Sequence, residues 1–159
     1  GVRDEMVSNI DLAATFEDLA GLRPPKYRAG SSIAPTFARP GRAKHRYTFF
    51  EHTWAPSLGK DPDKAYAGGT MDLIPSYVAV RSRTGLLVRL DLDNSWRGTR
   101  YAWEFYDYTE SPWEKTNTYA APRHRKQVAE LKAKIRQFDR CREFTRGTPL
   151  PKRCRGLTR

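Results

Sequence analysis

Three histidines and a pair of alternating aspartates are the residues of this sequence whose chemistry could serve a reaction or a metal ion. The histidines (His45, His52 and His124) form no H-E-x-x-H pattern, and the sequence has neither a phosphate-binding glycine loop nor a nucleophile elbow. Asp91 and Asp93 alternate at the end of an expected strand, but the glycine and the distal glutamate of an EF-hand are missing. We interpret both as solvated turn carboxylates, so the residues alone predict no reaction.

The two cysteines, Cys141 and Cys154, are separated by a segment that contains Gly147, Pro149 and Pro151. Such a composition is typical of a closed loop, and a disulfide across it would stabilise the fold by about 3 kcal/mol in the loop-closure description. A disulfide would also indicate an oxidising compartment. Two unrelated free thiols are the alternative, and two cysteines cannot supply a four-ligand zinc site.

The first 45 residues predict a short helix followed by a connector. Ser8 or Asn9 can cap the helix, Asp11 lies at the acidic position of a capping box after Ser8, and Gly21 supplies the left-handed stop. Residues 22–45 are rich in Pro, Gly, Ser and Arg and have no periodicity. The apolar residues that recur at helical spacing are Leu12, Phe16, Leu19 and Ala20.

The middle of the chain predicts strands, and the part after it predicts a longer helix. The strands are expected at residues 47–53, 76–81, 86–90 and 101–108. Residues 82–85 predict a tight hairpin turn in which Gly85 can take a positive φ, and residues 55–75 a long loop. The aromatic residues expected to pack in the core are Trp103, Phe105, Tyr106 and Trp113.

The helix expected from Arg123 to Asp139 carries its apolar residues on one side, which are Val128, Leu131, Ile135 and Phe138. We therefore expect an α+β fold, in which a small antiparallel sheet of about four strands has this C-terminal helix packed on one face. A helical arm would precede the sheet.

The positive charge of the chain is concentrated near its C-terminus. Residues 120–159 hold 13 Lys and Arg against three acidic residues, which accounts for +10 of the net charge of +11. Such a segment favours anionic partners, although a solvated helix face would look the same. Nucleic acid is disfavoured, because the aromatic residues that could stack on bases lie in the near-neutral part of the chain. No apolar run has the roughly 20 residues that a membrane span requires.

Five segments occur in a specific order, and together they resemble the C-terminal region of sulfatases of the arylsulfatase and N-acetylglucosamine-6-sulfatase type. They are residues 7–21 (VSNIDLAATFEDLAG), 30–35 (GSSIAP), 50–52 (FEH), 77–81 (YVAVR) and 104–117 (EFYDYTESPWEKTN). The Cys141 and Cys154 pair resembles the cysteine pair that closes the N-acetylglucosamine-6-sulfatase branch. The chain departs from the family at Ala14, where Pro is usual, and at Ser111, where Asp is usual.

The resemblance implies a secreted or periplasmic sulfuric ester hydrolase whose nucleophile is a formylglycine and whose metal is calcium. No Cys or Ser of this chain begins the C/S-x-P-x-R motif from which formylglycine is made. In the family, the calcium and sulfate ligands lie upstream of the matched segments. The chain is thus expected to be a piece of a larger enzyme that is inactive in isolation and binds no cofactor.

The resemblance also implies a division of the chain and a set of partners. Residues 1–45 would be the tail of the catalytic domain with a connector, residues 46–140 the C-terminal α+β subdomain, and residues 141–159 a basic, disulfide-closed tail. His52 and Trp54, at the matched "E-H" strand end, are the candidate substrate-binding residues. Arg81 could orient an anionic group, although an ion pair at the strand end is the commoner arrangement.

The expected partners are the sulfatase catalytic domain and a sulfated carbohydrate. Without that domain, the stripe of Leu12, Phe16 and Leu19 would dock onto the 128–138 helix or onto a second copy of the chain, or residues 1–42 would be mobile. The alternative function is a stand-alone module that binds anionic, sulfated polysaccharide through its basic C-terminal segment.

Overall fold

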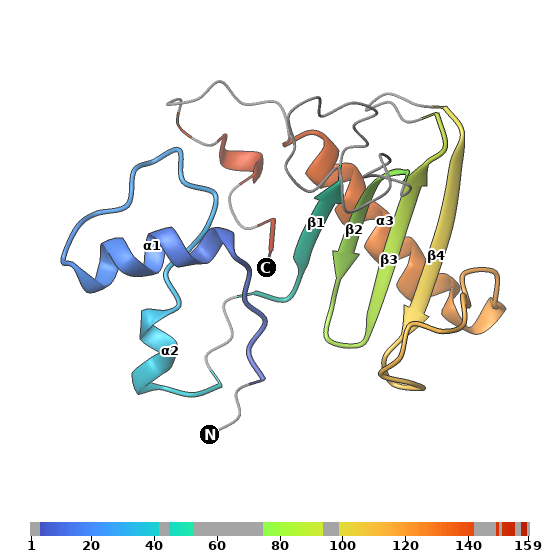
Figure 1. Ribbon diagram of the computed structural model, residues 1–159, viewed down its shortest axis with the longest axis horizontal. Coiled ribbons are helices and arrows are strands. Elements are labelled where there is room, and N and C mark those ends of the chain that lie inside the picture. The colour runs from blue at the N-terminus through green and yellow to red at the C-terminus, as the bar shows by residue number, and fades with distance from the viewer. Residues whose placement is uncertain are drawn as a thin grey trace, which may run out of the picture.

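The computed structural model describes residues 4–41, 45–52, 75–93, 99–141, 149, 151–154 and 157–158. Two helices form an N-terminal arm beside one edge of a sheet, and a longer helix lies behind the sheet (Figure 1). The elements are α1 (Ile10–Leu19), α2 (Ala34–Ala38), β1 (Thr48–His52), β2 (Ser76–Arg81), β3 (Gly85–Asp91), β4 (Tyr101–Asp107) and α3 (Arg125–Asp139). Short 3-10 turns cover Pro122–His124 and Lys152–Cys154.

The four strands form one antiparallel sheet in the order β1-β2-β3-β4. The register places Val80 opposite Leu87, and Leu87 opposite Phe105. Because side chains alternate between the two faces of a strand, these residues point to the same face. The α+β fold and its four-stranded sheet are confirmed.

Helix α3 closes the core of the sheet. Its buried residues are Val128, Leu131 and Ile135, and they pack against buried residues of β2, β3 and β4. At the end of α3, the ring of Phe138 stacks on Phe49 of β1 with a centroid distance of 4.9 Å. The predicted apolar side of the 123–139 segment is thus the side that faces the sheet, although its first turn is a 3-10 helix.

The hairpin between β2 and β3 occurs where the sequence predicts it, but Gly85 has a different role. Gly85 has no positive φ, a conformation found among the described glycines only at Gly21 and Gly41. A Cβ on Gly85 would approach Phe105 to 2.8 Å and the Gln127 side chain to 2.9 Å. Glycine is required here because the sheet, the Phe105 ring and α3 meet closely.

In the arm, polar contacts rather than an apolar core hold the helix in place. The carboxylate of Asp11, 1% exposed, accepts hydrogen bonds from the backbone N–H groups of Ser8 and Ser31, both at 2.9 Å. His45 Nε2 lies 3.0 Å from the same carboxylate. Gly21, with φ +72°, ends the helix as predicted. These contacts connect α1 to the middle of the connector at Ser31 and to its end at His45.

The apolar stripe of α1 is exposed in this chain. Leu12 is 48% exposed, Phe16 65% and Leu19 62%, while the residues of α1 that are buried are Asp11, Ala14 and Thr15. Docking of the stripe onto the 128–138 helix is therefore not observed. The short helix α2 was not predicted, because its five residues are too few to show a periodicity.

Three further expectations are decided by the fold. Cys141 and Cys154 form a disulfide, which ties the end of α3 to the Lys152–Cys154 turn. The expectation of a core position is wrong for Trp113, which is 68% exposed. It is also wrong to place Asp91 in solvent, since this residue is 7% exposed and its Oδ1 accepts the N–H of Asp93. None of the helices in the described part of the chain is long and apolar enough to cross a bilayer.

Candidate functional site

The predicted substrate residue His52 lies at the end of β1, on the sheet face opposite α3. Its ring stacks on that of Tyr77, directly across the strand pair, with a centroid distance of 5.5 Å. Because side chains alternate along a strand, Thr48 and Phe50 project to the same face as His52. Trp54, the other predicted substrate residue, lies outside the described residues.

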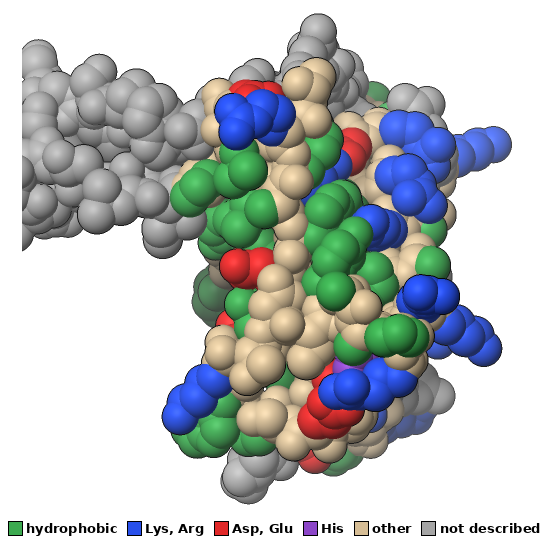
Figure 2. Space-filling view, turned by 90° about the vertical axis from the view of Figure 1, so that its right-hand side faces the viewer, with side chains coloured by type: hydrophobic (Ala, Val, Ile, Leu, Met, Phe, Trp, Pro, Cys, Tyr) green, Lys and Arg blue, Asp and Glu red, His purple; other side chains and the backbone are tan. Residues whose placement is uncertain are grey.

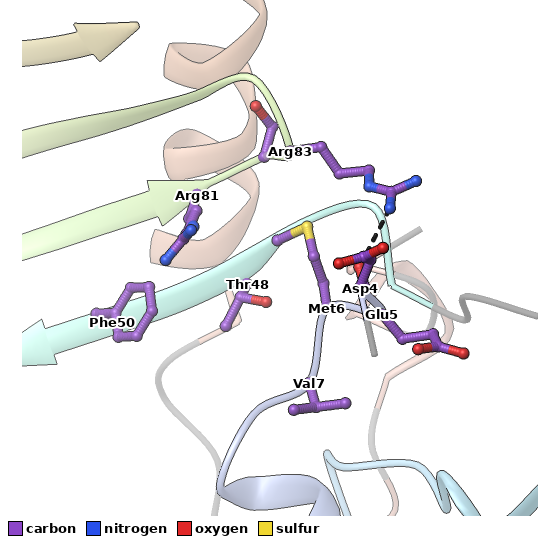
Figure 3. Close-up of a pocket in the computed structure, with 9 residues that line it drawn as sticks. Asp4, Glu5, Met6, Val7, Thr48, Phe50, Arg81 and Arg83 are labelled. Carbon is purple, nitrogen blue, oxygen red and sulfur yellow. Dashed lines mark hydrogen bonds between the residues drawn. The ribbon is translucent and has the colours of Figure 1, made fainter. Parts of the chain in front are cut away.

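A cavity of about 470 Å³ opens beside this row of side chains (Figure 3). Its floor comes from β1 and the end of β2, and the N-terminal segment that precedes α1 forms the opposite wall. Met6 and Phe50 give it apolar surface. The lining residues are Asp4, Glu5, Met6, Val7, Thr48, Phe50, Arg81, Ser82 and Arg83.

Arg81 is the cation of this cavity that is best placed to meet a ligand. It is exposed, and its guanidinium carbon lies 4.7 Å from the centroid of the Tyr108 ring. Among the described residues no carboxylate forms an ion pair with it, so the expected strand-end ion pair is not observed there. The second cation, Arg83, donates from Nη2 to the backbone oxygen of Asp4 at 3.2 Å.

The ring below Arg81 is held in its neutral form. Burial and a hydrogen bond to Glu114 raise the pKa of Tyr108 to about 12. The phenol therefore remains protonated at physiological pH and offers the guanidinium an uncharged π face. Stacking of this kind orients the guanidinium plane and leaves its N–H groups available to an acceptor.

The groups that line the cavity suit the binding of an anionic ligand. A guanidinium can donate two parallel hydrogen bonds to a sulfate, phosphate or carboxylate group. Apolar surface at Phe50 and Met6 inside the cavity suits a ring-shaped ligand, and the His52–Tyr77 pair extends this surface along the same sheet face outside the cavity. An anionic group attached to a ring matches this combination.

The structure also gives His124 a set of acidic partners that the sequence analysis did not anticipate. His124 is 5% exposed, its Nδ1 lies 3.4 Å from Asp107 Oδ2, and its Nε2 lies 3.8 Å from Glu110 Oε1. The three side chains could in principle hold a metal ion. No spacing rule reveals the cluster, because the turn after β4 and the start of α3 meet only in the folded chain.

A cation already occupies the open side of this cluster. Both oxygens of Glu110 accept hydrogen bonds from Arg123, at 2.9 and 3.0 Å, and this contact lowers the pKa of Glu110. Burial opposes ionisation of Asp107, but hydrogen bonds from Thr109 outweigh it and lower the pKa of Asp107. We therefore interpret the cluster as a structural link between β4 and α3.

His45 forms a second buried link. Its Nδ1 lies 2.7 Å from Thr158 Oγ1, and its Nε2 faces Asp11. The backbone oxygen of Thr158 accepts the N–H groups of Arg46 and Tyr47. This arrangement joins the arm, β1 and the last residues of the chain.

Comparison with solved structures identifies the fold. The chain superposes on the structure of BT4656 in complex with its substrate D-glucosamine-2-N,6-O-disulfate with a TM-score of 0.67 and 19% identity, over 87% of this chain and 25% of that one. A candidate sulfatase from Bacteroides thetaiotaomicron gives a TM-score of 0.57 and 25% identity, over 91% and 28%. The phosphonate monoester hydrolase of Silicibacter pomeroyi gives a TM-score of 0.58 and 20% identity, over 86% of this chain and 25% of that one.

No family model matches the sequence, and a search of the curated proteins finds no match. The chain therefore has the fold of a region found in sulfatases and phosphonate monoester hydrolases, which confirms the resemblance stated from its motifs. It spans about a quarter of the length of the solved structures it matches.

Proposed function

We propose that this chain is the C-terminal subdomain of a sulfatase that hydrolyses sulfate esters, and that it supports the catalytic domain and helps to shape the substrate pocket. One observation carries the proposal. The structural similarity to BT4656 extends over 87% of this chain but over only 25% of BT4656. This chain therefore matches one part of a much longer protein. The order of the quoted motifs supports the same assignment.

The catalytic groups would come from the rest of the parent enzyme. No Cys or Ser here begins a formylglycine motif, and the His124 cluster is closed by Arg123. In the parent enzyme, formylglycine would supply the nucleophile and calcium would neutralise charge on the sulfate oxygens. The isolated chain should therefore be inactive.

The residues of this chain would hold the carbohydrate part of the substrate. Arg81 would donate to a sulfate or carboxylate on the sugar, while Phe50 and the His52–Tyr77 pair would contact its ring. The disulfated glucosamine bound by BT4656 suggests a sulfated amino sugar as the substrate class. The sheet face that carries His52 would then form the edge of a substrate pocket that the catalytic domain completes.

The exposed stripe of α1 supports the proposed partner. Each large apolar side chain that becomes buried under a partner stabilises the complex by about 1.5–3 kcal/mol. Leu12, Phe16 and Leu19 would contact the catalytic domain in the parent enzyme, and a second copy of the chain is the alternative cover when that domain is missing. The arm up to residue 45 would then be structurally part of the catalytic domain. A secreted or periplasmic location is consistent with the disulfide.

Two activity measurements test the proposal. The purified chain with calcium should release no sulfate from an aryl sulfate or a glycosaminoglycan oligosaccharide, and calcium-dependent turnover would contradict it. A longer protein that contains this chain should have a C/S-x-P-x-R motif before Gly1 and should hydrolyse sulfate esters.

In that longer protein, the pocket residues can be tested separately. Arg81→Ala and His52→Ala should raise KM for a disulfated glucosamine more than for a simple aryl sulfate, because only the sugar reaches these residues. Lys115→Ala, a change at an exposed residue after β4, is the matched control. Equal effects on both substrates would argue against a sugar contact.

A further inference from the structure

The basic residues of α3 fall into an inward set and an outward set. Lys132 lies 4.3 Å from the Trp103 ring centroid and donates to the Tyr119 hydroxyl. Lys134 lies 4.4 Å from the Tyr47 ring centroid, and burial together with the charge of Arg46 lowers its pKa. Both lysines therefore contribute to packing between α3 and the sheet.

The outward set consists of arginines that follow the helix axis. Arg136 and Arg140 come close to three and four helical turns after Arg125, so the three lie on one face. All three are exposed, and Lys126 is exposed beside them. We call Arg125, Arg136 and Arg140 with Lys126 the α3 stripe. At about 1.5 Å per residue, it is about 22 Å long.

No acidic residue of α3 compensates this stripe. Glu130 accepts a hydrogen bond from the Tyr47 hydroxyl, and Asp139 binds Arg89 of β3 through two hydrogen bonds of 2.7 and 2.9 Å. Within the described part of the chain, no carboxylate forms an ion pair with a member of the stripe. Figure 2 shows Lys and Arg side chains projecting along one margin of the molecule.

We infer that the α3 stripe is a binding surface for a linear sulfated polysaccharide, separate from the cavity at Arg81. A row of uncompensated guanidinium groups complements a polymer with regularly spaced sulfates, since each guanidinium can bind a sulfate through two hydrogen bonds. The cavity opens on the sheet face opposite α3, so one polymer could be held at the stripe without filling the pocket. The inference does not depend on the proposed catalytic function.

The surroundings of the stripe favour a polysaccharide over single-stranded nucleic acid. Binding of single strands relies on exposed rings between the cations, on which bases stack. The rings next to α3 are already engaged, Trp103 and Tyr119 with Lys132 and with each other, and Phe138 with Phe49. The disulfide at the end of α3 also fits an extracellular setting, where sulfated glycans occur.

The test uses the 159-residue chain and heparin as the probe. The triple variant R125Q/R136Q/R140Q should bind heparin about tenfold more weakly at 0.1 M salt, because each exposed ion pair contributes a factor of roughly 1.5 to 5. Glutamine is a good helix former, so helicity measured by circular dichroism should not change. The matched control is R23Q/K26Q/R39Q, which removes the same charge from exposed positions on the arm and should retain wild-type affinity.

Four results would overturn the inference. Equal losses in the two triple variants would show that net charge and not the stripe drives binding. Unchanged affinity of the stripe variant would show that other residues bind heparin. Tighter binding to duplex DNA than to heparin at equal salt, lost in the same stripe variant, would show that the stripe recognises nucleic acid. Chemically desulfated heparin should not bind, and undiminished binding would contradict the role of sulfate.

Discussion

The arm and the sheet–helix unit (β1–β4 with α3) are held together by different forces. In the sheet–helix unit, fully buried apolar residues such as Leu87, Phe105 and Ile135 lie between the sheet and α3. In the arm, the largest apolar residues face solvent and a buried carboxylate, Asp11, organises the backbone. The difference teaches that the sheet–helix unit has an apolar core of its own, whereas the arm is held by polar contacts and leaves its large apolar side chains exposed.

Core truncations should show the largest difference between the two regions. Phe105→Ala should lower the free energy of unfolding by about 3–5 kcal/mol, since it removes a fully buried ring. Phe16→Ala in the arm should change it by no more than about 0.5 kcal/mol, because that ring is exposed in this chain. Urea unfolding followed by tryptophan fluorescence measures both. A large loss for Phe16→Ala would show that the stripe is already covered, for example by a second copy.

Loss of the disulfide should have the next largest effect on stability, and it should act on the sheet–helix unit. Replacing both Cys141 and Cys154 by Ser should destabilise the chain by about 3 kcal/mol, because the closed loop no longer restricts the unfolded state. The same loss should follow when the wild-type chain is unfolded with a reductant present. Uptake of two alkyl groups by the unreduced native protein, measured by intact mass, would show instead that the thiols are free.

Asp11→Ala should affect the arm and leave the sheet unchanged. The substitution leaves the N–H groups of Ser8 and Ser31 without their acceptor, at a cost of about 1–3 kcal/mol for such groups. Hydrogen exchange should become faster in residues 4–41, while β2, β3 and β4 keep their protection. Arg23→Ala, at an exposed residue that follows α1, is the control and should have little effect. Equal loss of protection in both regions would show that they unfold together.

The smallest expected effect is a loss of stability at alkaline pH, which arises from tyrosines of the sheet–helix unit. Burial and a hydrogen bond to Glu104 raise the pKa of Tyr106 to about 12, and Tyr108 has a similar value. Because the folded pKa lies above the ordinary value near 10, the associated stability is fully present below pH 10. It is lost as pH rises from 10 toward 12. Absorbance near 295 nm should show late phenolate formation, reduced in a Tyr106→Phe variant. Complete ionisation near pH 10 in the folded chain would contradict these environments.

The sequence predicted much of the sheet–helix unit because its signals are local. Alternation along β2 and the 3.6-residue period of α3 follow directly from which side chains must be buried. Gly21 ends its helix as expected because a left-handed residue is a local requirement. The ordered motifs around His52 and Arg81 were likewise enough to indicate the fold that the solved structures confirm.

The candidate site was only partly accessible from the sequence. His52 was selected from its motif, but the cavity that Arg81 lines depends on the N-terminal segment folding across β1, which no local pattern encodes. The His124 cluster was missed for the same reason, since its carboxylates come from a different turn. Trp113 was wrongly assigned to the core because aromatic character alone does not show whether a side chain in a turn faces the core or the solvent.

By itself, then, the sequence determined the strands, the amphipathic helix and the resemblance to a sulfatase region, since each rests on residues close in the chain or on an ordered set of motifs. The sequence left a disulfide and two free thiols as alternatives, and the fold brings Cys141 and Cys154 together. Only the tertiary structure decided which charges remain available. Lys132 and Arg136 look equivalent in the sequence, yet the first is held against Trp103 and the second faces solvent. The reason is physical: a charge is available only when no ring or opposite charge in the fold has already engaged it, and that depends on contacts between distant segments.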